Sequence, residues 1–128
     1  MSATATATRV FGLGRAVYGT SLIVKPALFA RPWIGREAER PTVELAVRAL
    51  GVRDAALGLG SLLTADDALS QRPWLAAGAI SDLVDMAATI AAGRSIPERS
   101  RQGVAIFAAM SSLAGAVLYA TRQKEVAH

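Results

Sequence analysis

QGVAIFAAMSSLAGAVLYAT, residues 102–121, is a run of twenty residues without a charged side chain. About twenty consecutive apolar residues form a helix long enough to cross the roughly 30 Å hydrocarbon core of a bilayer. A helix packed on a soluble core needs a polar face as well as an apolar one. Residues 102–121 offer no charge for such a face, so this stretch predicts a transmembrane helix.

Three apolar blocks of similar length precede this stretch, at residues 10–30, 42–64 and 73–93. Polar or charged connectors separate the four blocks, at residues 31–41, 65–72 and 94–101. Because short connections join antiparallel neighbours, we expect an all-α fold, a four-helix transmembrane bundle with up-down-up-down topology. The single membrane domain is expected over residues 9–122, between a disordered tail at residues 1–8 and a C-terminal tail at residues 123–128.

The composition narrows the classes of protein to which the chain can belong. Its 128 residues fit one domain, and 52% of them are hydrophobic and 19% charged, which excludes a disordered chain or a coiled-coil rod. There is no cysteine, and the one histidine is His128. Disulfides, zinc–thiolate sites and most histidine-based catalysis are therefore excluded. We expect no enzyme activity, no catalytic residue, no cofactor and no metal site.

The basic residues indicate a lipid partner. The net charge is +4, and the arginines and lysines are scattered mainly at the ends of the predicted helices. Nucleic-acid-binding proteins instead gather basic residues on one face or in a recognised motif. Arginines at helix ends are typical of chains that meet anionic lipid headgroups. We therefore expect the lipid bilayer of the cell membrane as partner, with several spans, and no nucleic acid.

The distribution of these basic residues also predicts an orientation, because cytoplasmic loops of membrane proteins carry an excess of lysine and arginine. The connectors after the first and third blocks carry six arginines: Arg31, Arg36, Arg40, Arg94, Arg99 and Arg101. The opposite side carries four basic residues: Arg9, Arg72, Arg122 and Lys124. The first set is predicted to be cytoplasmic, with both chain termini outside.

Glycines inside the blocks support the membrane interpretation. Each costs a helix in water about 1 kcal/mol relative to alanine, whereas small residues let membrane helices approach closely. In the second block Gly51 and Gly58 fall on one side of the helix, and Gly60 follows. We predict that these three glycines pack against another helix. A soluble bundle with an unusually apolar surface, or a protein on the membrane surface, is the alternative.

Charged residues within the apolar blocks form the candidate site. The second block contains Arg48, Arg53 and Asp54, and the third contains Asp82 and Asp85. A charge near the centre of a membrane helix costs about 2.5–3.5 kcal/mol on insertion scales, so these residues are expected to neutralise one another.

Their depths suggest which of them pair. Arg53 and Asp82 each lie eleven residues from the block end at the same membrane face, which is about 16 Å. This predicts an Arg53–Asp82 rung between antiparallel helices, with Arg48 and Asp85 nearer to the same face. Asp54 is expected to pair with Arg15 or Arg48.

Three interpretations of this intramembrane cluster stay open. It is a structural ion-pair network that fixes the helix register, or a proton or ion relay or a polar cavity for a solute. In the third, the helix boundaries differ and the charges lie near the interface. An acid/base pair or half a metal site is disfavoured, because no other carboxylate cluster or usable histidine accompanies Asp82 and Asp85.

Residues 48–60, RALGVRDAALGLG, resemble a stretch in small bacterial membrane proteins that are frequent in high-GC actinobacteria and described only as domains of unknown function. The resemblance rests on Gly51, Arg53, Asp54, Leu57, Gly58, Asp82 and Asp85. It implies four membrane helices, with a Gly-x-Arg-Asp-x-x-Leu-Gly stretch in the second and aspartates in the third. It implies no activity.

The function expected from these features is that of an accessory or structural membrane component that acts through helix–helix contacts. Its partner would be a second copy of the chain or a larger membrane protein. The alternative is a small oligomeric carrier for protons, ions or a small solute that uses the Arg/Asp cluster. A third possibility is an enzyme subunit that holds a lipid or quinone, which no particular residue supports.

Overall fold

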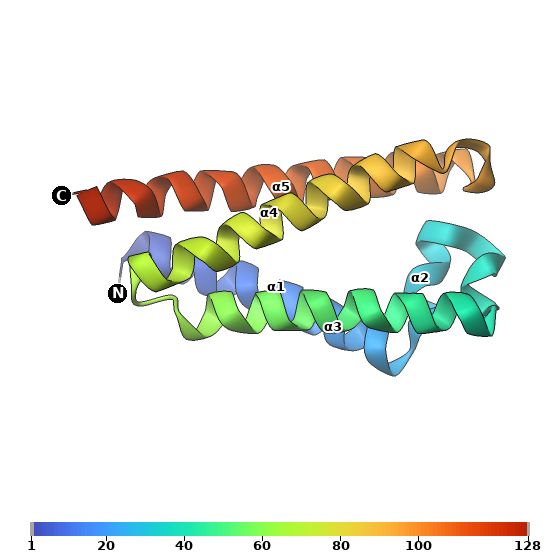
Figure 1. The fold of residues 1–128 in the computed structure, drawn as a ribbon, viewed down its shortest axis with the longest axis horizontal. Helices are drawn as coiled ribbons and strands as arrows, with labels where there is room; N and C mark the ends of the chain where they lie inside the picture. Colours follow the sequence, from blue (N-terminus) through green and yellow to red (C-terminus); the bar gives the residue numbers. More distant parts are fainter. Residues whose placement is uncertain (1, 128) are drawn as a thin grey trace.

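The computed structural model describes residues 2–127, so His128 lies outside the described residues. It contains five α-helices: α1 (Ala3–Val24), α2 (Pro26–Ile34), α3 (Pro41–Leu63), α4 (Ala68–Ala91) and α5 (Glu98–Ala127). Short 3₁₀ turns, Gly35–Glu39 and Gly93–Ser95, precede α3 and α5, and residues 2–127 contain no strand. The all-α prediction is confirmed. Successive long helices run in opposite directions along the long axis of the molecule: α1, α3, α4 and α5 (Figure 1).

The four long helices form two pairs. α1 packs along α3, and α4 packs along α5, whereas contacts between the pairs are sparse. Figure 1 shows that α2 and the connection from α4 to α5 lie at one end of the molecule. The two chain ends and the connection from α3 to α4 lie at the other end. The α1–α3 pair and the α4–α5 pair are therefore packed loosely against each other, and polar side chains connect them.

Glycine explains why α1 and α3 lie so close. A Cβ atom built at Gly19 would lie 2.3 Å from the backbone nitrogen of Ala55, and one at Gly58 would lie 2.4 Å from that of Ala16. Gly51 meets the carbonyl oxygen of Gly19 in the same way. Backbones at this separation have no room for a side chain. Gly51 and Gly58 therefore pack on α1, as expected from the sequence.

Gly60 packs differently from the other two predicted glycines. A Cβ there would lie 2.3 Å from the indole ring of Trp74 in α4. It therefore makes room for an aromatic side chain between the helix pairs, rather than for a second backbone.

The predicted tails are helical where the structure describes them. Residues 3–8 form the first turns of α1, because the hydroxyl of Ser2 accepts a hydrogen bond from the Ala5 N–H at 3.1 Å. Serine is a favoured N-cap residue. At the other end α5 continues through Ala127, five residues beyond Arg122, which donates a hydrogen bond to the carbonyl of Ala65. The described parts of the two predicted tails, residues 3–8 and 123–127, are therefore continuations of α1 and α5.

The first apolar block is interrupted rather than continuous. Proline disfavours the helical conformation in the residue before it, and Lys25, which precedes Pro26, has φ −134° and ψ 69°. α1 therefore ends at Val24, and a separate helix, α2, begins at Pro26. The predicted single helix over residues 10–30 is wrong at this point.

The third block begins earlier than predicted, at Ala68 instead of residue 73. The Asp67 carboxylate caps the helix by accepting hydrogen bonds from the Leu69 N–H and the Ser70 hydroxyl. These hydrogen bonds lower the pKa of Asp67 below its usual value. The cap lets the helix start five residues before Pro73, which lies inside α4.

The outer surface of the long helices is apolar. α4 and α5 are the two described helices that are both long and apolar enough to cross a membrane. Only 22% and 17% of the residues in their apolar windows are buried, whereas a core helix of a soluble protein would be mostly buried. The side chains that a soluble protein would hide from water are therefore on the outside of this chain.

Candidate functional site

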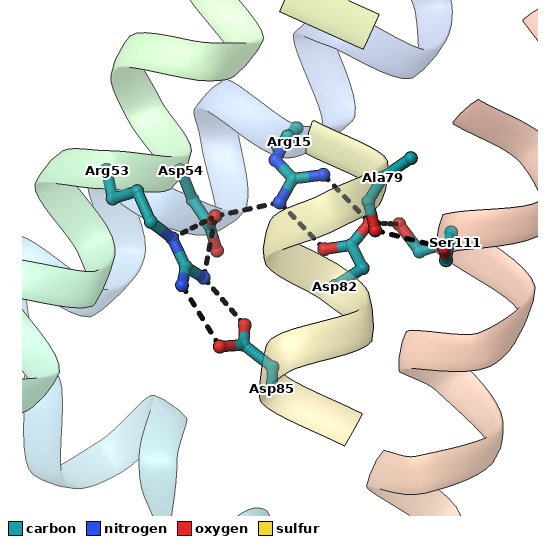
Figure 2. Close-up of polar contacts among 8 residues, drawn as sticks. Arg15, Arg53, Asp54, Ala79, Asp82, Asp85 and Ser111 are labelled. Atoms are coloured by element: carbon teal, nitrogen blue, oxygen red, sulfur yellow. Dashed lines mark hydrogen bonds and ion pairs between the residues drawn. The ribbon is translucent and has the colours of Figure 1, made fainter. Parts of the chain in front are cut away.

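Arg15 is the centre of the charged cluster. Its guanidinium group donates two hydrogen bonds to the two carboxylate oxygens of Asp82, at 2.7 and 2.9 Å. It donates a third, at 3.0 Å, to Oδ1 of Asp54. Arg15 in α1 thus ties α3 to α4 (Figure 2). Such fork-like arginine–carboxylate pairs are among the stronger hydrogen bonds in proteins.

A second arginine completes the cluster from α3. Arg53 donates to both carboxylate oxygens of Asp85, at 3.0 and 2.6 Å. It also donates to Oδ1 of Asp54, its neighbour in sequence, at 3.2 and 3.3 Å. Asp54 therefore lies between the two guanidinium groups and accepts hydrogen bonds from both.

Serines of α5 attach the fourth long helix to the cluster. The Ser111 hydroxyl donates to Asp82 at 2.7 Å. The adjacent Ser112 hydroxyl donates to the carbonyl oxygen of Ala79 in α4 at 3.0 Å. All four long helices thus contribute to one polar layer, roughly midway along them.

The charges of this layer do not balance. Two guanidinium groups, from Arg15 and Arg53, face three carboxylates, from Asp54, Asp82 and Asp85. When all five groups are ionised, the cluster therefore carries a net charge of −1. Burial makes an excess charge costly unless a proton or a cation neutralises it.

Asp54 has a carboxylate oxygen that is free to accept that proton or bind that cation. All three hydrogen bonds that it accepts go to Oδ1, and within residues 2–127 no donor reaches Oδ2 (Figure 2). Asp82 and Asp85 each accept hydrogen bonds at both oxygens. Asp54 as a whole residue is only 7% exposed, and its second oxygen is an acceptor with unused capacity.

The predicted pairing of Arg53 with Asp82 is wrong, because Asp82 pairs with Arg15 and Arg53 pairs with Asp85. Side chains on a helix lean toward its N-terminus. The N-terminus of α3 lies at the α2 end of the molecule (Figure 1). The long Arg53 side chain therefore reaches the carboxylate one turn nearer to that end. Comparing backbone depths alone missed this offset.

Arg48 does not join the cluster. Its guanidinium group donates to the carbonyl oxygen of Ile23, near the end of α1. Arg48 therefore supplies a hydrogen-bond donor to a carbonyl at the C-terminus of α1, where the helix breaks before Pro26. Of the five predicted residues, the structure brings together Arg53, Asp54, Asp82 and Asp85, and of the two predicted partners of Asp54 it selects Arg15.

An open cleft lies beside the cluster, between the two helix pairs. It has a volume of about 490 Å³, and Arg15, Asp54, Asp82 and Asp85 line it. The rest of its wall is mostly apolar and comes from α1, α2 and α5: Val10, Phe11, Gly14, Tyr18, Trp33, Val104, Phe107, Ala108, Met110 and Ser111. The carboxylates thus meet a space that is large enough for a small solute.

A second polar layer, near the chain ends, was not predicted. Arg122 is 3% exposed and pairs with Glu125 at 2.7 Å. The guanidinium group of Arg72 lies over the Tyr119 ring, 5.2 Å from its centroid, and donates to the Tyr119 hydroxyl at 3.2 Å. Gln71, completely buried, donates to the carbonyl of Ser61 at 3.0 Å. Gln71 and Arg72 lie in the predicted connector, and Arg122 and Glu125 lie beyond the fourth apolar block, so the apolar blocks gave no signal for this layer.

The side chains that the structure brings together limit the kinds of chemistry that the site can support. In the described part of the chain, no group of three or more His, Cys, Asp or Glu residues is placed to hold a metal ion. A scan of family models, a search of curated proteins and a search of solved structures each give no match to this chain. What the site does is therefore inferred from its own geometry.

Proposed function

We propose that α1, α3, α4 and α5 all cross a membrane. At 22 and 23 residues, α1 and α3 are about 33 Å long, enough for a hydrocarbon core of about 30 Å. Large apolar side chains are exposed on both: Val10, Leu13, Val17, Leu45, Val52 and Leu59. Charges that lower their apolar character, Arg15, Arg53 and Asp54, point into the cluster instead of toward lipid.

The charges at the two ends support the predicted orientation. At the α2 end, Arg31 and Arg40 pair with glutamates, but the described residues offer no ion pair to the other four arginines: Arg36, Arg94, Arg99 and Arg101. At the opposite end Arg122 is buried, Arg72 lies against Tyr119 and Arg9 pairs with Asp66, which leaves the exposed Lys124. The free positive charge thus favours the α2 end as the cytoplasmic one.

Cysteine labelling tests both the span count and the orientation, because the chain has no cysteine of its own. Ser70, in the first turn of α4, and Ser95, between α4 and α5, are both exposed. In intact cells S70C should react with a membrane-impermeant maleimide, and S95C should react only after permeabilisation. Labelling of both from outside would show that α4 does not cross the membrane. The reverse pattern would invert the orientation.

We infer that the protein is a small membrane carrier that moves protons, with Asp54 as the exchanging group. The observation that carries this proposal is the unbalanced cluster: three carboxylates that line an open cleft face only two guanidinium groups. A purely structural network gains nothing from an unpaired carboxylate oxygen. An exchange site needs one, because a proton or an N–H donor must find a free acceptor.

Proton flux into liposomes that contain the purified protein tests this function. With a potassium diffusion potential that makes the interior negative, the wild type should acidify the interior faster than empty liposomes do. D54N removes the exchanging carboxylate but keeps a similar shape, so its flux should fall to that of empty liposomes. E44Q is the matched control, because Glu44 lies on the same helix outside the cluster.

The outcome separates two functions. If the wild type conducts no more than empty liposomes, the carrier function is contradicted, and the accessory role expected from the sequence is favoured. If D54N and E44Q reduce the flux equally, the flux does not pass through Asp54.

A further inference from the structure

The cleft continues into a groove between α1 and α5. A second cavity, of about 720 Å³, lies along the same two helices, and both cavities are lined by Val10, Phe11 and Met110. α1 and α5 make few contacts with each other, so this is where the bundle is open. The groove therefore leads from the apolar outer surface to the carboxylates.

The two parts of this groove have different chemistry. The outer part is lined by apolar side chains alone, including Leu113, Val117 and Leu118. The inner part reaches Asp54, and Tyr18 and Phe107 meet there with ring centroids 6.4 Å apart. Met110 and Leu113 are 66% and 65% exposed, so the outer wall faces whatever surrounds the helices. An occupant would need a long apolar part and one polar end.

The cluster determines what that polar end must be. Its net charge of −1 attracts a cation, and the free Oδ2 of Asp54 accepts a hydrogen bond that no described residue donates. A protonated amine supplies both the positive charge and the N–H donor. A quaternary ammonium ion supplies only the charge, and an alcohol only the donor.

We propose that the groove between α1 and α5 binds protonated long-chain amines, which enter sideways from the bilayer. The ammonium group donates to Asp54 Oδ2 in the inner cleft. The alkyl chain lies in the outer groove against Phe11, Met110 and Leu113. This site rests on the proposed carrier function and names the class of solute.

The two tryptophans allow this to be measured directly. Trp33 lines the inner cleft, whereas Trp74 packs on Gly60 and lines neither cavity. W74F therefore leaves Trp33 as the sole tryptophan, and W33F leaves Trp74 as a control. A terminally brominated alkylamine, which quenches tryptophan on contact, is added to the protein in lipid nanodiscs. The trimethylammonium and alcohol analogues of equal chain length are compared with it.

The amine should quench Trp33 saturably, with a half-maximal concentration about tenfold below that of either analogue, which corresponds to about 1.4 kcal/mol. Trp74 in the W33F variant should show only weak, non-saturable quenching. D54N, in the W74F background, should abolish the preference for the amine.

A pair of glycines provides the matched steric test. Gly14 lines the inner cleft, and a Cβ there would meet no atom within 4 Å. A Cβ at Gly103 would also meet no atom within 4 Å, but Gly103 lines neither cavity. G14L should therefore fill the groove and weaken amine quenching about tenfold, whereas G103L should leave it unchanged.

Three results would overturn the proposal. Equal quenching by amine and alcohol would show that the groove holds an alkyl chain without selecting its polar end. Equal effects of G14L and G103L would place the amine elsewhere. A disulfide between two copies of the M110C variant that forms equally with and without the amine would show that a second copy fills the groove. If proton flux persists in any of these cases, the carrier function stands and only the solute class is wrong. Amine binding without flux contradicts the carrier and retains the site.

Discussion

R15L should cause the largest loss of membrane abundance and of melting temperature among single substitutions in the cluster. The Arg15 guanidinium group bridges Asp82 and Asp54 and is about nine-tenths buried. Without it, one guanidinium group faces three carboxylates, so the net charge of the cluster changes from −1 to −2. Removing one partner of a buried ion pair costs about 3–5 kcal/mol in soluble proteins, and pairs between membrane helices often contribute less.

Two further variants make the R15L result specific. R48L removes an arginine from α3 that donates to the Ile23 carbonyl and not to the cluster, so its effect should be clearly smaller. R15K keeps the charge but loses the fork that meets both oxygens of Asp82, and should fall between the wild type and R15L. Equal losses from R15L and R48L would contradict the central role of Arg15. The measurements are membrane abundance and melting in mild detergent.

G58A should separate α1 from α3 and destabilise the protein by about 1–3 kcal/mol, the usual range for an added methyl group in a tightly packed site. The added Cβ would lie 2.4 Å from the Ala16 nitrogen and 2.5 Å from the Gly12 carbonyl oxygen. Both atoms belong to a helix backbone, which cannot move aside as a flexible side chain can.

The control for G58A is a substitution with the opposite expected sign. A Cβ at Gly103 would meet no atom within 4 Å, and alanine favours a helix over glycine by about 1 kcal/mol in water. G103A should therefore leave the melting temperature unchanged or raise it. A G58A protein that melts like the wild type would show that α1 and α3 are less tightly packed than described.

The sequence predicted most of the helical architecture because its signals were strong and local. The apolar run at residues 102–121 falls inside α5, and the block at residues 42–64 matches α3 within one residue at each end. Local signals also explain the misplaced boundaries. Asp67 caps a helix start inside a connector, and Pro26 ends a helix inside an apolar block. Average hydrophobicity does not register either effect.

The site was predicted by composition but not by geometry. Buried charges must find partners, which led to a predicted set of five residues. The structure brings four of them together, Arg53, Asp54, Asp82 and Asp85, whereas Arg48 binds elsewhere. Which arginine meets which aspartate depends on helix tilt and on the direction of the side chains, and neither is visible in a one-dimensional pattern. The role of Ser111 and the cleft beside Asp54 depend on how the two helix pairs meet. No sequence signal could have located them.

The sequence separation of the ion pairs has a consequence for biogenesis. Arg15 lies 39 residues before Asp54 and 67 residues before Asp82. In the proposed membrane location, α1 leaves the ribosome with a charge whose main partner belongs to α4, two long helices later. α1 and α3 must therefore stay sheltered by the insertion machinery until α4 arrives, and a chain truncated after Leu63 should be removed by quality control instead of integrating. Insertion and folding of this small protein are then one cooperative event.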